Sequence, residues 1–170
     1  GSLQKGRYLK NISQRKTIRL DRELYQKPNQ PFSITICTYD KIPLLNKFGE
    51  LIFHAILEGD LARRSDLIAV CVMPDHVHFL LSPISENLID LIDRWKSYTT
   101  HLLRKEGWKS KIWQRSFYDH ALRKEEDIKT VAEYIVCNPL RKGLVQDRQD
   151  YPYSWHKWME SGRPQRAAPT

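Results

Sequence analysis

Two apolar segments separated by little more than Pro74-Asp75 constrain the fold of this chain more than any other feature. Residues 67–73 read LIAVCVM, and residues 77–81 read VHFLL. Apolar runs of this length, bounded by turn residues, are typical of buried β-strands. The very short connection indicates a tight hairpin, although it contains no glycine. The sequence therefore predicts two adjacent strands in the core.

The remaining elements follow from the periodicity of apolar residues. Alternation of Phe and Ile with Ser and Thr predicts a strand over 32–38. Apolar residues that recur every three or four positions predict helices over 44–56 and 88–102, the second ending near Gly107. Residues 116–123 can supply a fourth strand. This β-α-β-β-α-β order predicts a ferredoxin-like α+β fold, a four-stranded antiparallel sheet with two helices on one face.

The second strand of the hairpin carries two histidines, His76 and His78, one residue apart. Alternate side chains of a strand leave by the same face, so both imidazoles can reach one cation. Imidazole nitrogen is a good ligand for divalent first-row metals. Two histidines on a half-exposed strand are as often surface residues as ligands, so a metal site requires a third ligand.

A candidate third ligand lies in the segment after Glu125-Glu126-Asp127, an acidic run that favours a helix start. Tyr134 and Asn138 are four residues apart, which places a phenol and a carboxamide on one face of this additional helix. Pro139 biases the residue before it away from helical geometry, so Asn138 is expected at the helix end. The two side chains can still share one site.

Three motifs carry a resemblance to a known family. They are MPDHVHFL at residues 73–80, IWQRSFYDH at residues 112–120 and EYIVCNPLRKGLV at residues 133–145. In order and spacing they resemble the motifs of single-tyrosine HUH transposases, in particular the REP-associated tyrosine transposases. The resemblance runs from about Phe32 to Trp155, and three motifs in sequence are far more specific than any one of them.

The resemblance implies a role for each residue of the candidate site. His76 and His78 would be the HUH histidines, Asn138 the third, polar metal ligand, and Tyr134 the nucleophile. The cofactor would be Mg²⁺ or Mn²⁺, which polarises a scissile phosphodiester for in-line attack. The attack would leave a 5′-phosphotyrosine and a free 3′-hydroxyl, so that strands are rejoined without ATP. The helix with the nucleophile would cover the open sheet face, and the histidines would lie on a central strand.

Other residues compete for these roles. Tyr118 also lies among polar residues, but its stretch is expected to be a strand, in which aromatic packing is common. His120 is interpreted either as a DNA contact or as a histidine at the edge of the core. Asp75 precedes the first histidine and is expected to serve the turn or to support a ligand rather than to bind metal. Tyr134 is the preferred nucleophile.

The chain is basic, with 28 Lys and Arg against 20 Asp and Glu and a formal net charge of +8. This balance favours a polyanionic partner, and aromatic residues among the basic ones can stack on unpaired bases. By resemblance, the partner is single-stranded DNA folded into imperfect hairpins, bound by either a monomer or a homodimer. The candidate DNA contacts are Lys96, Arg115, Arg123, Arg141, Lys142, Arg7 and Lys10.

Length and composition indicate one folded domain. The chain has 170 residues, of which 41% are hydrophobic. We expect residues 32–158 to form the transposase domain, residues 1–31 to be a basic segment that begins with a cloning scar at Gly1-Ser2, and residues 159–170 to be a flexible tail. Three scattered cysteines, with no signal peptide and no long apolar segment, predict a cytoplasmic protein outside the membrane.

Three other classes compete with this interpretation. A metallo-β-lactamase-type hydrolase also uses His-x-His, but it requires a following Asp-His that Phe79-Leu80-Leu81 does not provide. A ferredoxin-like nucleic-acid-binding module explains the charge and the aromatic residues but leaves Tyr134 and Asn138 unexplained. A domesticated transposase would bind DNA hairpins without mobilising any DNA element. The intact set of candidate catalytic residues favours an active enzyme.

Overall fold

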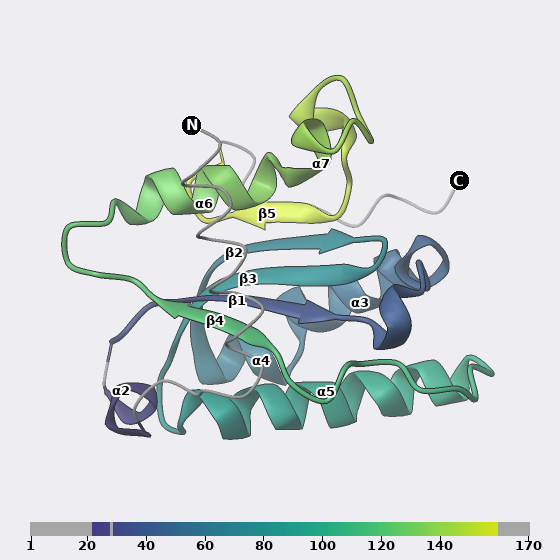
Figure 1. The fold of residues 1–170 in the computed structure, drawn as a ribbon, viewed down its shortest axis with the longest axis horizontal. Coiled ribbons are helices and arrows are strands. Elements are labelled where there is room, and N and C mark those ends of the chain that lie inside the picture. Colours follow the sequence, from purple (N-terminus) through teal and green to yellow (C-terminus); the bar gives the residue numbers. More distant parts are fainter. Residues whose placement is uncertain (1–21, 28, 160–170) are drawn as a thin grey trace.

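The computed structural model describes residues 22–27 and 29–159, so Arg7, Lys10 and the tail from residue 160 lie outside the described residues. In the described part of the chain, one sheet contains five antiparallel strands in the order β4-β1-β3-β2-β5 (Figure 1). The strands are β1 (Phe32–Cys37), β2 (Ser65–Met73), β3 (His76–Pro83), β4 (Tyr118–Ala121) and β5 (Ser154–His156).

The first four strands have the neighbours of the ferredoxin-like split motif, which confirms the predicted α+β fold. β5 corrects the predicted number of four strands. It lies at the edge of the sheet beside β2 and pairs with Ala69, Val70 and Cys71. A strand of three residues, all of them buried, is too short for alternation of apolar and polar side chains to reveal it in a sequence.

β2 and β3 form the predicted hairpin at the centre of the sheet. Pro74-Asp75 makes the turn, and Met73 lies opposite His76. β3 also pairs with β1, so both edges of the strand that carries the histidines are hydrogen-bonded. Phe79 is fully buried on one face. By the alternation of strand side chains, His76 and His78 point to the other face.

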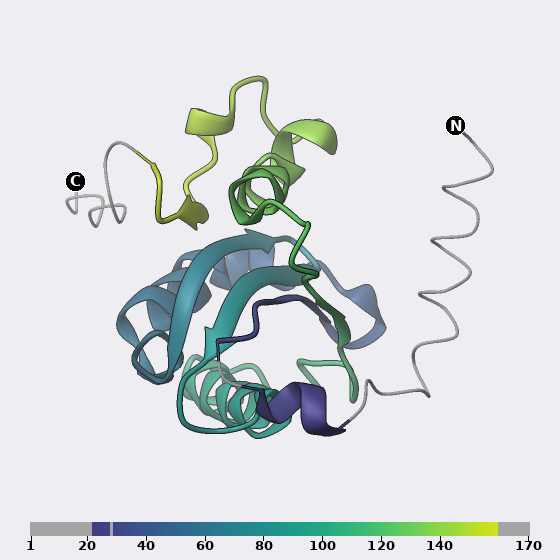
Figure 2. The ribbon, with the colours of Figure 1, turned by 90° about the vertical axis from the view of Figure 1, so that its left-hand side faces the viewer.

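Two long helices, α3 (Leu45–Glu58) and α5 (Leu88–Lys105), cover one face of the sheet (Figure 2). They confirm the two predicted helices, and α5 ends shortly before Gly107 as expected. Phe79 packs edge-to-face against Trp95 of α5, with ring centroids 5.1 Å apart. The short helices are α2 (Arg22–Gln26), α4 (Asp60–Arg64) and the 3-10 turns Tyr39–Lys41 and Arg148–Asp150. No helix in the described ranges has the length and apolarity needed to cross a membrane.

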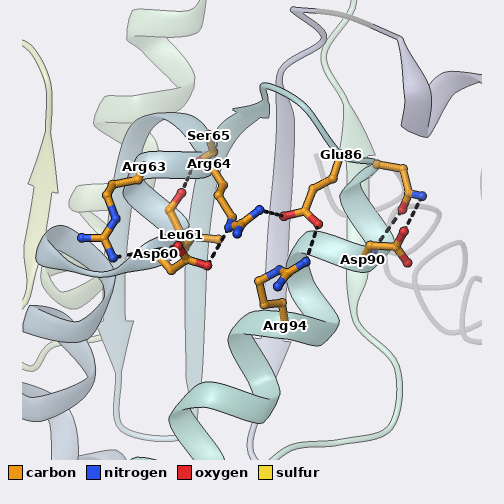
Figure 3. Close-up of polar contacts among 9 residues, drawn as sticks. Asp60, Leu61, Arg63, Arg64, Ser65, Glu86, Asp90 and Arg94 are labelled. Atoms are coloured by element: carbon orange, nitrogen blue, oxygen red, sulfur yellow. Dashed lines mark hydrogen bonds and ion pairs between the residues drawn. The ribbon is translucent and has the colours of Figure 1, made fainter.

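A network of ion pairs joins α4 to α5 (Figure 3). Arg64 Nε lies 2.6 Å from Asp60 Oδ2, and the same guanidinium lies 3.6 Å from Glu86 Oε1. Arg94 reaches the other oxygen of Glu86 at 3.3 Å. The Glu86 side chain is mostly buried, whereas the Arg94 side chain is exposed, so the network joins the surface of α5 to the segment that precedes it.

The opposite face of the sheet is covered by α6 (Ile128–Val136), which lies over β2, β3 and β5 (Figures 1 and 2). Ala132 and Ile135 of α6 share a second buried cluster with Cys71 and Leu80. The additional helix that carries Tyr134 is therefore present, on the sheet face predicted for it.

Helix α6 ends at Val136, and after Cys137 a new short helix begins, α7 (Asn138–Arg141). Pro139 lacks the N–H that would continue α6, whereas the first turn of a helix does not need that N–H. Asn138 was expected at the end of the nucleophile's helix, and it is instead the first residue of the next one. The break places Asn138 over the sheet, where 6% of its surface is exposed.

Candidate metal and nucleophile site

His76 and His78 lie side by side on the α6 face of β3. Their ring centroids are 5.2 Å apart, and both side chains are half-buried. The register of the sheet surrounds them with residues of the neighbouring strands: Thr35 and Cys71 both lie opposite His78. The pair therefore sits within the sheet rather than at its rim.

The side chain of Asn138 reaches both histidines. Its Nδ2 atom lies 3.3 Å from His76 Nε2 and 3.4 Å from His78 Nδ1. The carboxamide nitrogen thus faces the ring nitrogens and its oxygen faces Arg141. A half-turn of the terminal torsion exchanges the two, so a metal ligand role for Oδ1 requires that half-turn. Three polar side chains from β3 and α7 thus converge on one point.

The protonation state of His78 suits metal ligation. Burial, followed by the charges of His76 and Arg141, lowers the pKa of His78 to about 3, so this imidazole is neutral near pH 7. Asp75 Oδ1 lies 2.7 Å from His76 Nδ1. A proton on Nδ1 donated to Asp75 leaves a lone pair on His76 Nε2, which faces Asn138. Asp75 thus has the geometry of the supporting residue expected from the sequence.

A divalent ion fits this set of donors. Two imidazole nitrogens and a carboxamide oxygen can bind Mg²⁺ or Mn²⁺ and leave other positions for phosphate oxygens. Across residues 22–27 and 29–159, no group of three or more His, Cys, Asp or Glu side chains has the arrangement of a metal site. His76, His78 and Asn138 stay the candidate ligands predicted from the sequence.

Tyr134 joins this cluster through Arg141. The guanidinium carbon of Arg141 lies 3.6 Å from the centroid of the Tyr134 ring, and Arg141 Nη2 lies 3.5 Å from Asn138 Oδ1. The phenol is 62% exposed on α6, so a large ligand can approach it from solvent. Arg141 was predicted as a DNA contact, and its link between Tyr134 and Asn138 was not foreseen.

Tyr118 lies on the same sheet face as the histidines. Thr35 of β1 lies opposite His78 on one side and opposite Tyr118 on the other, so all three side chains leave by one face. Tyr118 is half-buried. Next to it on this face, His120 Nε2 lies 2.8 Å from Glu126 Oε1 at the edge of the sheet. Tyr118 is therefore the proper comparison for Tyr134 in a test of the nucleophile.

The other predicted DNA contacts are dispersed. Lys96 lies on α5, on the helix-covered side, and its Nζ donates to the carbonyl oxygens of Gln114 at 2.8 Å and Arg115 at 3.3 Å. Arg115 and Arg123 are exposed in loops on either side of β4. Lys142 follows α7 and is exposed near the candidate site. Their contact with DNA stays a prediction.

An ion-pair cluster that the sequence analysis missed fixes α6 to β5. Glu133 accepts hydrogen bonds from His156 Nε2, at 2.7 Å, and from Arg148. Burial alone would raise the pKa of Glu133, but the hydrogen bond from His156 and the charge of Arg148 outweigh it and lower that pKa. Because these residues are far apart in sequence, no spacing pattern could have indicated their contact.

Comparisons with known proteins identify the family of this chain. The family described as "Transposase IS200 like" matches residues 30–138. The REP-associated tyrosine transposase of Escherichia coli (strain K12) is 31% identical over 111 residues, which cover 65% of this chain and 66% of that protein. A solved structure of a REP-associated tyrosine transposase bound to a REP hairpin matches with a TM-score of 0.65 and 26% identity, covering 81% of this chain and 82% of that one. The chain belongs to the IS200-like transposase family, which confirms the resemblance.

Proposed function

We propose that this protein is a metal-dependent nuclease and strand transferase that cleaves and rejoins single-stranded DNA through a 5′-phosphotyrosine intermediate. The observation that carries the proposal is the convergence of Asn138 on His76 and His78, with Tyr134 joined to the cluster through Arg141. Membership of a transposase family supports it. Tyr134 is the nucleophile, and the two imidazoles with the carboxamide hold the ion.

The reaction exchanges one phosphodiester for another. A bound Mg²⁺ or Mn²⁺ would supply Lewis-acid polarisation of the scissile phosphate. The Tyr134 hydroxyl loses its proton and its oxygen attacks phosphorus. The bond from phosphorus to the 3′ oxygen breaks, and that oxygen takes up one proton to become the free hydroxyl, so no net proton is gained or lost. Attack by a 3′-hydroxyl on the phosphotyrosine reverses these steps and joins a strand. Arg141, stacked on the Tyr134 ring, holds the phenol and places positive charge beside the phosphate oxygens.

The proposed substrate is single-stranded DNA that folds into an imperfect hairpin. The related structure that matches over 81% of this chain is of a REP-associated tyrosine transposase bound to a REP hairpin. The net charge of +8 favours attraction to any polynucleotide, so hairpin preference requires shape or exposed bases in addition to charge.

The test of the nucleophile uses covalent trapping. Incubation with end-labelled hairpin DNA and Mn²⁺ is expected to give a protein–DNA adduct that survives denaturing electrophoresis. Tyr134→Phe removes the attacking oxygen and abolishes the adduct, while Tyr118→Phe, the matched control on the sheet face, retains it. If Tyr118→Phe loses the adduct and Tyr134→Phe keeps it, the assigned nucleophile is wrong.

The test of the metal ligands separates binding from cleavage. His76→Ala with His78→Ala is expected to abolish Mn²⁺-dependent cleavage, because two of the three proposed ligands are gone. DNA affinity should change little, since contacts with the phosphate backbone dominate it. Anisotropy of labelled DNA and gel analysis of cleavage measure the two quantities, and metal-dependent cleavage by the double variant would contradict the assignment.

One observation favours a second candidate, a hairpin-binding protein that does not cleave. The Tyr134 ring is stacked on Arg141, 3.6 Å away, and in the described part of the chain it is linked to the histidines indirectly, through Arg141 and Asn138. A phenol linked to the proposed metal ligands through other side chains is the arrangement expected of a protein that binds DNA without cleaving it. A domesticated protein of this kind would bind the hairpin with full affinity and form no adduct with Mg²⁺ or Mn²⁺. The trapping experiment on the unmodified protein distinguishes the two.

A further inference from the structure

A groove runs along α6 on the side that faces β5 and the residues after it. Its open volume is about 610 Å³. It is lined by Lys129, Thr130, Glu133, Tyr134, Cys137, His156 and Trp158. Tyr134 is therefore a wall of this groove as well as the neighbour of Arg141. A strand of DNA with its phosphate at Tyr134 would have an adjoining nucleotide within reach of the groove.

Trp158 forms an aromatic surface in this groove, with cations beside it. The side chain is 40% exposed, and its backbone N–H donates to His156 Nδ1 at 3.1 Å. The Nζ atoms of Lys129 and Lys157 lie 5.6 Å and 5.9 Å from the indole ring. Buried His156 therefore anchors the backbone of a partly exposed indole, and two lysine ammonium groups lie over its ring.

The single carboxylate in the lining does not oppose an anionic ligand. Glu133 accepts from His156 and Arg148, so its negative charge is already matched within the protein. Lys157 also pairs with Asp66 at 3.0 Å, but this pair is exposed, and such pairs are weak. Both lysines are thus available to phosphates of a bound strand.

We infer that this groove binds one unpaired nucleobase of the DNA strand, stacked on Trp158, with the flanking phosphates held by Lys129 and Lys157. The inference rests on the proposed function, and it identifies a base-binding subsite next to the nucleophile. Stacking of a base on an aromatic side chain raises affinity about 5- to 150-fold. An exposed cation–π contact is equivalent to about two- to fivefold, so a base can displace either lysine from the indole and leave its ammonium for phosphate.

The first experiment measures coupling between the indole and one base. Fluorescein-labelled single-stranded hairpin DNA is titrated by anisotropy, without divalent metal, into Tyr134→Phe protein, so that cleavage plays no part. Trp158→Ala in this background is expected to weaken binding by at least about fivefold, and Trp158→Phe much less. Tyr98→Ala, which removes an aromatic ring of similar exposure from α5, should not change affinity.

An abasic scan locates the base. Each unpaired nucleotide is replaced in turn by an abasic one, and the affinity for the protein is measured. At a single position the loss of affinity should equal the loss caused by Trp158→Ala. At that position, combining the abasic nucleotide with Trp158→Ala should weaken binding no further than either change alone. If every abasic position weakens the Trp158→Ala protein as much as the protein with Trp158 intact, no base stacks on Trp158 and the inference is overturned.

Photocrosslinking repeats the test on the unmodified chain, so that a misfolded variant cannot hide the answer. 5-Iodo-deoxyuridine placed at each unpaired position should crosslink to Trp158 at that same position, as found by mass spectrometry of the digested adduct. Crosslinks at every position to other residues only would overturn the subsite. Crosslinking to Trp158 without any phosphotyrosine adduct in Mn²⁺ would instead uphold the subsite and refute the proposed cleavage.

Discussion

The two faces of the sheet share the same strands but differ in what they bury. On the face covered by α3 and α5, β3 contributes Phe79 to a continuous apolar core. On the face covered by α6, the same strand contributes His76 and His78, which meet Asn138. One strand of alternating side chains therefore contributes to the core on one face and carries the proposed metal ligands on the other. The comparison teaches that the backbone that carries the two histidines is also part of the core.

The largest loss of stability should come from a substitution on the apolar face of the sheet. Phe79→Ala removes a fully buried ring that packs on Trp95, and we expect a loss of about 3–5 kcal/mol in the free energy of unfolding. His76→Ala, on the half-buried side of the same strand, should cost far less. Urea unfolding followed by circular dichroism measures both variants. Equal losses would show that the two faces do not differ in the way the structure indicates.

The second effect is on the affinity of the proposed metal site for Mn²⁺. Asp75→Asn keeps the size of the side chain but replaces the carboxylate that accepts from His76 Nδ1. We expect Mn²⁺ affinity to fall about 10- to 100-fold, because the partner that fixes the tautomer and ring orientation is weakened. Isothermal titration calorimetry with Mn²⁺ measures it, and Asp66→Asn, an exposed site on β2, serves as the control. Unchanged affinity would mean that Asp75 serves only the turn.

The third effect is on the stability of α6 when the cap of its first turn is removed. Asp127 caps this helix by accepting from the backbone N–H of Lys129 at 3.0 Å and from the Thr130 hydroxyl at 2.9 Å. Asp127→Ala should cost about 0.5–2 kcal/mol of stability. Hydrogen exchange should rise in α6 more than in α5 if the two layers are separately stabilised. A uniform rise across both helices would show one cooperative unit.

The sequence predicted those features of the two layers that depend on neighbouring residues, and it missed contacts that depend on a break between helices or on residues far apart in the chain. Periodicity predicted α3 and α5, and the histidine motif predicted the face on which the site lies. The contact of Arg141 with Tyr134 was missed, because it depends on the break that Pro139 introduces between α6 and α7. The contact of Glu133 with His156 was missed for a different reason, since it requires β5, a strand too short to show a period.

The smallest effect near neutral pH concerns His78. Its pKa is lowered to about 3 in the folded protein, chiefly by burial, whereas an unfolded histidine titrates near 6.5. Below pH 6.5 the His78 imidazole is therefore protonated in the unfolded chain but not in the folded one, so stability falls as pH decreases toward 3. Between pH 7 and 6 the loss should be less than about 1 kcal/mol, and it grows at lower pH. Chemical unfolding at several pH values should give a flatter profile for His78→Asn than for the unmodified protein, with His101→Asn, an exposed site on α5, as the control. If His78→Asn keeps the full slope, the pH dependence arises elsewhere and the α6 face does not hold a neutral imidazole at this position.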